Sequence, residues 1–175
     1  KHGIKFGIWI EPEMTNTVSE LYEKHPDWVV KAPERDVVTG RGGTQLVLDL
    51  SNPEVQDYIF SIVDDLMTEN PDIDYIKWDA NMSIVNHGSQ YLSKDRQSHL
   101  YIEYHRGFEM VCDRIRAKYP DLTIQACASG GGRANYGVLP WFDEFWVSDN
   151  TDALQRIHMQ WGTSYFFPSI AMASH

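Results

Sequence analysis

Two aspartates, Asp79 and Asp149, each follow an apolar run in which a buried strand is expected. A carboxylate at the end of such a strand is costly unless it has polar partners. Lys77 lies two residues before Asp79, on the same side of a strand, where its charge would keep Asp79 ionised and suit a nucleophile. Asp149 follows Trp146-Val147-Ser148, and aromatic neighbours favour the protonated carboxyl of a general acid. Glycoside hydrolysis uses two such carboxylates in one pocket. The alternative for each aspartate is a purely structural role.

Polar residues also follow other strand-like runs, with Glu11 and Glu13 after Ile10, and Cys127 and Ser129 after Ala126. Active sites of parallel α/β folds lie at the carboxyl ends of the strands, so this repetition predicts one shared site. The alternative is that the strands simply end in polar loops.

Aromatic residues make up 13% of the chain, and Trp9, Trp78 and Trp146 lie at or near strand ends. An indole face can pack on the apolar face of a sugar ring, whereas core packing is the alternative for any single Trp.

Several other chemistries find no support in the motifs. The glycine runs at 40–43 and 130–132 are followed by no Gly-Lys-Ser/Thr, and no GxGxxG opens a helix after a strand, so neither run predicts a phosphate-binding loop. Two cysteines cannot form a disulfide framework or a four-cysteine zinc site. Seven scattered histidines show no HxH or HExxH spacing, and Cys127 has no recognisable histidine partner.

The composition describes a globular, acidic chain of 175 residues with 42% hydrophobic residues and a formal net charge of −10. That charge disfavours nucleic acid and anionic membrane surfaces as partners. No apolar run approaches the roughly 18 residues of a spanning helix, and no signal peptide is visible. With only two cysteines, a reducing cytoplasm is the expected location, and secretion stays open because no initiator Met is present.

Short apolar runs alternate with helical patterns, which favours repeated βα units and a parallel sheet buried on both faces. The expected strands are Phe6 to Ile10, 74–79, 122–126, 145–147 and 164–167, with a further strand-like run at 46–50. The expected helices are 17–24, 52–69, 98–118 and 152–161, and Gly40 to Gly43 forms a turn. Such a pattern fits a doubly wound sheet or a (β/α)8 barrel, which typically needs about 250 residues.

Five longer motifs carry a family resemblance that covers essentially all 175 residues. They are Lys5-Phe6-Gly7-Ile8-Trp9-Ile10-Glu11-Pro12-Glu13-Met14, Gln45-Leu46-Val47-Leu48-Asp49-Leu50-Ser51, Tyr75-Ile76-Lys77-Trp78-Asp79, Cys127-Ala128-Ser129-Gly130-Gly131-Gly132-Arg133 and Ser148-Asp149-Asn150-Thr151-Asp152-Ala153. In this order they resemble the catalytic domain of family 36 glycoside hydrolases, the large microbial α-galactosidases.

The resemblance implies an α/β fold, a (β/α)8 TIM barrel that is incomplete here. Residues 1–175 would form about strands 3 to 7 of the catalytic domain, without the first two strands and the last. In that register, the strand near Phe6 is the third, Asp79 ends the fourth, Cys127 the fifth and Asp149 the sixth, and 164–167 is the seventh.

The implied function is a retaining α-galactosidase that hydrolyses terminal α-linked galactose of raffinose-family and melibiose-type substrates through a covalent glycosyl-enzyme. Asp79 matches the nucleophile and Asp149 the acid/base. The positions that match the galactose pocket are Trp9, Arg41, Lys77, Asn81, Cys127, Ser129 and Gly130. The resemblance implies no metal and no cofactor, a small carbohydrate as the partner, and a homo-oligomer for the full-length protein.

Two alternatives stay open. The same frame could carry an α-N-acetylgalactosaminidase or a raffinose-type transglycosylase, which turnover of an N-acetylated aryl galactoside would reveal. A non-catalytic sugar-binding fragment is the alternative from a different class. We expect the 175 residues alone to be inactive, because the family's pocket also uses acidic residues from the second strand and open sheet edges are unfavourable.

Overall fold

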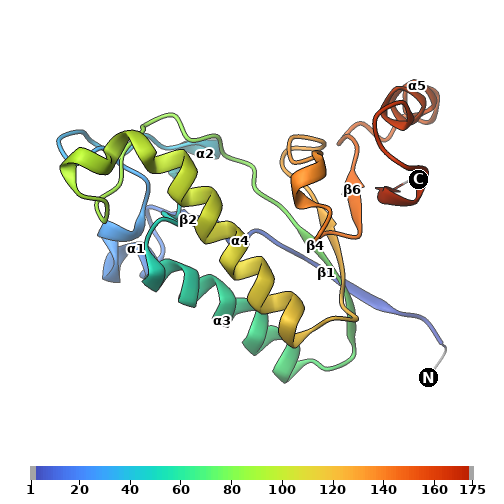
Figure 1. The fold of residues 1–175 in the computed structure, drawn as a ribbon, viewed down its shortest axis with the longest axis horizontal. Helices are drawn as coiled ribbons and strands as arrows, with labels where there is room; N and C mark the ends of the chain where they lie inside the picture. Colours follow the sequence, from blue (N-terminus) through green and yellow to red (C-terminus); the bar gives the residue numbers. More distant parts are fainter. Residues whose placement is uncertain (1–2, 174–175) are drawn as a thin grey trace. The chain divides into compact units, whose positions relative to one another are not determined.

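The computed structural model describes residues 3–173 and divides them into two compact units (Figure 1). The first unit contains residues 3–11, Asn70–Ala80 and 121–173, and the second contains Pro12–Glu69 and Asn81–Pro120. Because the chain passes between the units at Glu11 and again at Ala80, the two strands that precede these points both belong to the first unit.

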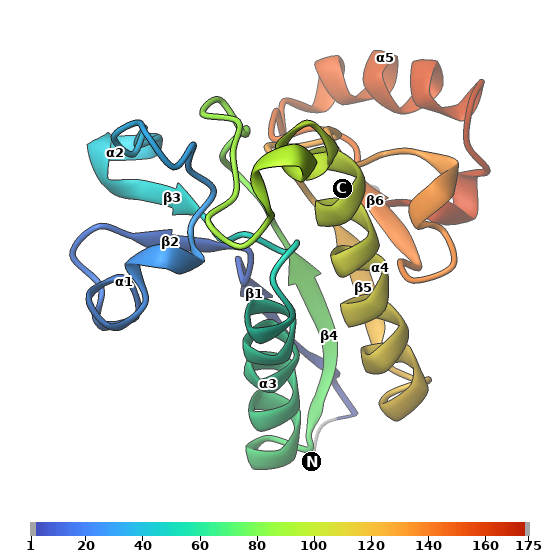
Figure 2. The same cartoon turned by 60° about the vertical axis from the view of Figure 1, so that its left-hand side comes forward.

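The first unit is built on a five-stranded sheet in which all neighbouring strands are parallel. The order across the sheet follows the order along the chain: β1 (Phe6–Ile10), β4 (Ile73–Trp78), β5 (Thr123–Ala126), β6 (Glu144–Trp146) and β7 (Met172–Ala173). Figure 2 shows β1 and β4 side by side. The predicted α/β class with a parallel sheet is therefore confirmed, and four of the five predicted strands lie within one or two residues of their expected places.

The fifth predicted strand, at 164–167, is wrong. Ser164 is the last residue of helix α5 (Ala153–Ser164), and the amides of Phe166 and Phe167 both donate to the carbonyl of Thr163. The aromatic residues that suggested a strand therefore belong to the turn that closes the helix. The strand itself comes later, as β7, after a short 3-10 helix η4 (Ser169–Ala171).

The expected sheet buried on both faces is observed on one face only. The register places Ile76, Trp78 and Phe145 on that face, whereas Tyr75 and Lys77 on the opposite face are half-buried. Ile76, Trp78 and Phe145 are at most 1% exposed, whereas Phe6 is 60% and Trp9 50% exposed. Among the described residues β1 pairs only with β4, so it forms an edge of the sheet.

The second unit is organised around two long helices, α3 (Pro53–Glu69) and α4 (Leu100–Lys118), which lie side by side (Figures 1 and 2). The same unit contains a two-stranded antiparallel sheet of β2 (Met14–Asn16) and β3 (Gln45–Val47). Sequence patterns predicted β3 but not the three-residue β2. The shorter elements are α1 (Glu20–Lys24), η1 (Pro26–Trp28), η2 (Lys94–His99), and α2 (Arg41–Thr44), where Gly42 and Gly43 have positive φ and form the predicted turn.

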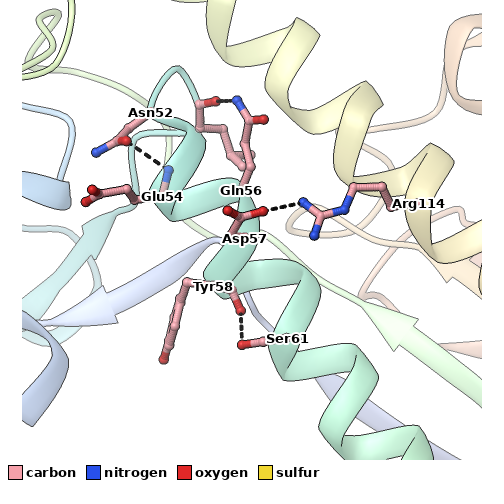
Figure 3. Close-up of polar contacts among 8 residues, drawn as sticks. Asn52, Glu54, Gln56, Asp57, Tyr58, Ser61 and Arg114 are labelled. Carbon is pink, nitrogen blue, oxygen red and sulfur yellow. Dashed lines mark hydrogen bonds and ion pairs between the residues drawn. The ribbon is translucent and has the colours of Figure 1, made fainter.

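The start of α3 shows why the sequence folds as predicted there (Figure 3). The side chain of Asn52 accepts a hydrogen bond of 3.0 Å from the amide of Glu54, and proline at the first helical position needs no amide partner. Arg114 of α4 donates to Asp57 of α3 at 2.7 Å. The two helices are thereby tied together near the start of α3.

A close backbone contact fixes α4 further. A Cβ on Gly107 would lie 1.9 Å from the carbonyl oxygen of Leu50, so only glycine allows the helix to approach this closely. The same carbonyl accepts a hydrogen bond of 2.9 Å from the side chain of Gln56.

The polar loop that follows Asp79 is anchored on a buried carboxylate. Asp49 is fully buried and accepts hydrogen bonds from the hydroxyls of Ser51, at 2.6 Å, and of Ser89. Burial raises the pKa of Asp49, and the serine hydrogen bonds oppose that rise. Gln97 holds the backbone of Ser89 through two further hydrogen bonds. Residues 89–97 are therefore fastened to the second unit.

Candidate active site

The site begins where the parallel ladders of the first unit continue beyond the strands. The amide of Asp79 donates to the carbonyl of Ile10 at 2.9 Å, and the amide of Cys127 donates to the carbonyl of Trp78 at 2.8 Å. Asp79 and Cys127 therefore follow neighbouring strands at the same edge of the sheet, the carboxyl edge at which α/β enzymes carry their catalytic groups.

The carboxylate of Asp79 is buried and surrounded by hydrogen-bond donors. Trp9 Nε1 donates to its Oδ2 at 3.0 Å, and the amide of Ala80 donates to its Oδ1 at 2.9 Å. The thiol of Cys127 is a further hydrogen-bond partner. Because donors favour the ionised form of a carboxylate and fix its orientation, this arrangement suits a nucleophile.

Cys127 acts as a donor and not as a thiolate. Burial, followed by the hydrogen bond to Asp79, raises the pKa of the Cys127 thiol to about 12, and the amide of Gly130 partly opposes this rise. At neutral pH the sulfur therefore keeps its proton.

The loop after β5 packs against the loop that carries Asp149. Ser129 and Gly130 have positive φ values of 47° and 83°. A Cβ on Gly130 would lie 3.2 Å from the amide nitrogen of Asp149, and one on Gly131 would lie 2.8 Å from the carbonyl oxygen of Val147. Glycines are needed here because the two backbones touch. Through Cys127 and Gly130, the surroundings of Asp79 and Asp149 are continuous.

Asp149 is exposed, and its Oδ1 accepts a hydrogen bond of 2.7 Å from Trp146 Nε1. The expected aromatic enclosure is therefore absent among the described residues, because the indole contributes its polar edge and leaves the carboxyl open. Lys77 Nζ lies 3.7 Å from the centroid of the Trp146 ring. Lys77 lies on β4, two residues before Asp79, and its ammonium group also contacts the indole that donates to Asp149.

A polar layer inside the sheet was missed by the sequence analysis. Tyr75 Oη donates to Glu144 Oε1 at 2.6 Å, and Gln125 Nε2 donates to the same oxygen at 2.7 Å. Burial, followed by the hydrogen bond to Glu144, raises the pKa of Tyr75. Gly7 leaves room for the Tyr75 ring, which a Cβ there would meet at 3.0 Å. The period-2 pattern that places Tyr75 on the side of Lys77 could have revealed this layer.

Three residues singled out in the sequence lie elsewhere. Trp78 is 1% exposed and packs edge-on against Phe142, so it belongs to the core. Arg41 lies in the second unit, exposed, within the turn at α2. Asn81 is half-buried and is the first residue of the second unit after Ala80. The sugar contacts expected of Arg41 and Asn81 stay predictions.

Within residues 3–173, no group of three or more His, Cys, Asp or Glu side chains is arranged to hold a metal ion. Over the same residues, no helix combines the length and the apolar character needed to cross a membrane. Cys112 and Cys127 are both buried free thiols.

A family model described as Melibiase matches residues 1–175, the whole chain. The chain belongs to the Melibiase family. α-Galactosidase AgaA of Geobacillus stearothermophilus is 42% identical over 173 residues, and α-galactosidase 2 of Pediococcus pentosaceus is 40% identical over 174 residues. These alignments cover 99% of this chain but only 23% and 24% of the two relatives, so the chain spans about a quarter of their length.

Solved structures of this family agree in fold. The α-galactosidase from Lactobacillus brevis superposes with a TM-score of 0.93 at 41% identity, covering 99% of this chain and 23% of that one. AgaA from Geobacillus stearothermophilus, a family 36 α-galactosidase, superposes with a TM-score of 0.92 at 40% identity, covering 99% of this chain and 24% of that one. The family expected from the motifs is therefore confirmed.

Proposed function

We propose that the protein carrying this chain is a retaining α-galactosidase, with Asp79 as nucleophile and Asp149 as acid/base. The observation that carries the proposal is the buried carboxylate of Asp79, held by Trp9, the Ala80 amide and Cys127, beside a loop that packs on the backbone of Asp149. Retaining glycosidases need one fixed, ionised carboxylate and one that exchanges a proton.

Relatives support the same pair. Structures of AgaA variants contain raffinose in one case and stachyose in another. Each variant has one aspartate replaced, by Asn or by Ala, and the two replaced aspartates are separated by as many residues as Asp79 and Asp149 are here. We therefore infer that this protein acts on the same class of α-galactosides.

The parallel sheet supports a (β/α)8 barrel for the whole catalytic domain. Five strands that follow one another in space in chain order, all parallel, are what consecutive barrel strands require, whereas a doubly wound sheet reverses its order. With β7 at Met172–Ala173 as the seventh strand, these would be barrel strands 3 to 7.

The first chemical step forms a covalent glycosyl-enzyme. A carboxylate oxygen of Asp79 attacks the anomeric carbon of the terminal α-galactoside, while the bond from that carbon to the leaving oxygen breaks. The carboxyl proton of Asp149 passes to the leaving oxygen, so that a neutral alcohol departs and Asp149 becomes a carboxylate.

The second step releases the sugar. The carboxylate of Asp149 takes a proton from water as the water oxygen attacks the anomeric carbon, and the ester bond to Asp79 breaks. Two inversions give α-galactose, with Asp79 ionised and Asp149 protonated again. Trp9 and Lys77 would contact the sugar from β1 and β4, and Ser129 and Gly130 from the loop after β5. The sugar contacts of Arg41 and Asn81 are proposed from the family motifs alone.

The test is the stereochemical course of hydrolysis by the full-length protein. Proton NMR during cleavage of 4-nitrophenyl α-galactoside should show α-galactose first, before mutarotation. First appearance of β-galactose would contradict the retaining mechanism, and absence of any cleavage would contradict the α-galactosidase assignment.

A further inference from the structure

Arg156, on α5, is buried in the first unit at 3% exposure and has no part in the mechanism described above. Its Nη1 donates to the carbonyl of Ser148 at 2.9 Å, and its Nη2 donates to the carbonyl of Ala173 at 3.1 Å. One guanidinium thus joins the loop after β6 to the end of β7.

Burial of this charge is not explained by stability alone. A buried guanidinium is expensive unless all its donors are used, and Arg156 Nε has no hydrogen-bond partner among residues 3–173. A neutral side chain of similar length would avoid that cost. Gln160, one turn further along α5, already shows such a solution, because its amide donates to the carbonyl of Ala173 at 2.7 Å.

Two short routes lead from Arg156 to the carboxyl of Asp149. The first is the backbone, because the carbonyl that Arg156 holds belongs to Ser148, directly before Asp149. The second is Trp146, whose ring centroid lies 5.3 Å from the guanidinium carbon of Arg156 and whose Nε1 donates to Asp149 at 2.7 Å.

Arg156 contacts an ordered segment, because the loop that carries Asp149 is held by further hydrogen bonds. The Ser148 hydroxyl accepts from the amide of Asn150 at 3.1 Å, and the Asn150 side chain accepts from the amide of Asp152 at 2.9 Å. Asp152 caps α5 by accepting from the amide of Gln155. Arg156 contacts this segment, Trp146 and the end of β7 through a single guanidinium.

We propose that Arg156 is the positioning residue for Asp149: it fixes the Ser148 carbonyl and the Trp146 ring so that the Asp149 carboxyl is aimed at the leaving oxygen. This inference rests on the proposed function, because it takes Asp149 as the acid/base. Arg156 touches neither substrate nor reacting atoms and acts only through its two contacts.

The proposal predicts a dependence on the leaving group. Departure of a sugar alkoxide needs a proton from Asp149, whereas a dinitrophenolate leaves without one. A misplaced Asp149 therefore slows the first step on melibiose and spares it on 2,4-dinitrophenyl α-galactoside. General loss of the fold would lower both rates together.

The experiment compares three variants of the full-length protein on both substrates. In Arg156→Met both routes are lost, and we expect kcat/KM on melibiose to fall about 10- to 100-fold, because misplacing a reacting group by about 1 Å can cost about 100-fold. On 2,4-dinitrophenyl α-galactoside, kcat/KM should fall less than about 3-fold, with KM for melibiose changed little. Arg156→Lys, which keeps the charge and can reach one carbonyl, should recover part of the melibiose rate.

Gln160→Met is the matched control, because it removes a hydrogen bond to the same Ala173 carbonyl without touching Ser148 or Trp146. It should leave both substrates within about 2-fold of the unaltered protein. Equal loss on the two substrates in Arg156→Met, or an equal effect of Gln160→Met, would overturn the proposal. If Arg156→Met does not fold, Arg156→Lys carries the same comparison.

Failure of the proposed function would look different, since the unaltered protein would then cleave neither substrate. External azide gives a second, independent readout. Azide attacks the glycosyl-enzyme without help from a general base. It should therefore raise turnover of 2,4-dinitrophenyl α-galactoside more in Arg156→Met than in the unaltered protein. No such difference would contradict a displaced Asp149.

Discussion

The indole Nε1 of Trp9, at the edge of the sheet, donates a hydrogen bond of 3.0 Å to Oδ2 of Asp79 on the neighbouring strand. The strand register pairs Trp9 with Lys77, which lies two residues before Asp79. The indole therefore extends toward the carboxyl end of β4 to reach the carboxylate. Under the proposed function Trp9 has two roles: its Nε1 orients Asp79, and its half-exposed ring packs on the sugar.

Trp9→Phe separates these roles, because it removes the donor and keeps an aromatic face. We expect kcat on 4-nitrophenyl α-galactoside to fall about 10- to 100-fold, because a hydrogen bond to a charged group contributes about 1.5–3 kcal/mol. KM should change less. Trp161→Phe, at an exposed indole on α5, is the control and should have no effect. A large rise in KM with unchanged kcat would assign Trp9 to sugar binding alone.

The high pKa of Cys127 predicts how its reactivity depends on pH. With a folded-state pKa of about 12 against an ordinary value of 9.0, the folded protein keeps the thiol proton between these values while the unfolded chain loses it. Stability that is present below pH 9 should therefore decline as pH rises toward 12.

The pH dependence of the rate at which iodoacetamide alkylates Cys127, followed by mass spectrometry, checks this. Burial of the thiol slows alkylation at every pH, whereas the pKa sets the midpoint of the rate profile. At pH 9 to 10, Cys127 should stay unmodified in the folded protein, whereas the same thiol should be alkylated in the chain unfolded in urea. A folded-state alkylation midpoint near pH 9 would show that Asp79 receives no hydrogen bond from a protonated thiol.

Gly130→Ala tests the contact between the loop after β5 and the loop that carries Asp149. Gly130 has φ +83°, and the added Cβ would lie 3.2 Å from the amide nitrogen of Asp149. Such strain costs about 1–3 kcal/mol, and moving the Asp149 loop should lower kcat/KM at least about 10-fold. Gly162→Ala in α5, where nothing lies within 4 Å, should leave activity unchanged. Equal activity of both variants would show that the loop contact is dispensable.

Ser89→Ala tests the anchor of the loop after Asp79. It leaves the buried Asp49 without one of its donors, which should lower the free energy of unfolding by about 1–3 kcal/mol. Residues 81–92 should also become more sensitive to limited proteolysis. Ser98→Ala, at an exposed position of η2, should change neither measurement. An unaltered protease pattern in Ser89→Ala would mean that Asp49 does not hold the loop.

The sequence predicted most of the parallel sheet because its strands combine apolar runs with polar ends, a local signal. It placed Asp79 and Cys127 correctly at one edge, since both follow strands of neighbouring βα units. The helix around residues 53–69 was equally predictable from Asn52 and Pro53.

Other features depend on tertiary contacts that no local pattern shows. Phe166 and Phe167 look like a strand but close α5, because their amides are used by Thr163. The exposure of Asp149 follows from the direction of the Trp146 indole. Arg156 has an ordinary place on an amphipathic helix, and only its contacts with Ser148 and Trp146 distinguish it.

The covalent role of Asp79 is tested most directly by trapping the glycosyl-enzyme. The full-length protein is incubated with 2,4,6-trinitrophenyl 2-deoxy-2,2-difluoro-α-galactoside, digested, and analysed by tandem mass spectrometry. We predict one difluorogalactosyl ester on Asp79, abolished by Asp79→Ala in a protein with unchanged circular dichroism. An adduct on any other residue, or complete inactivation of Asp79→Ala at the normal rate, would contradict the account.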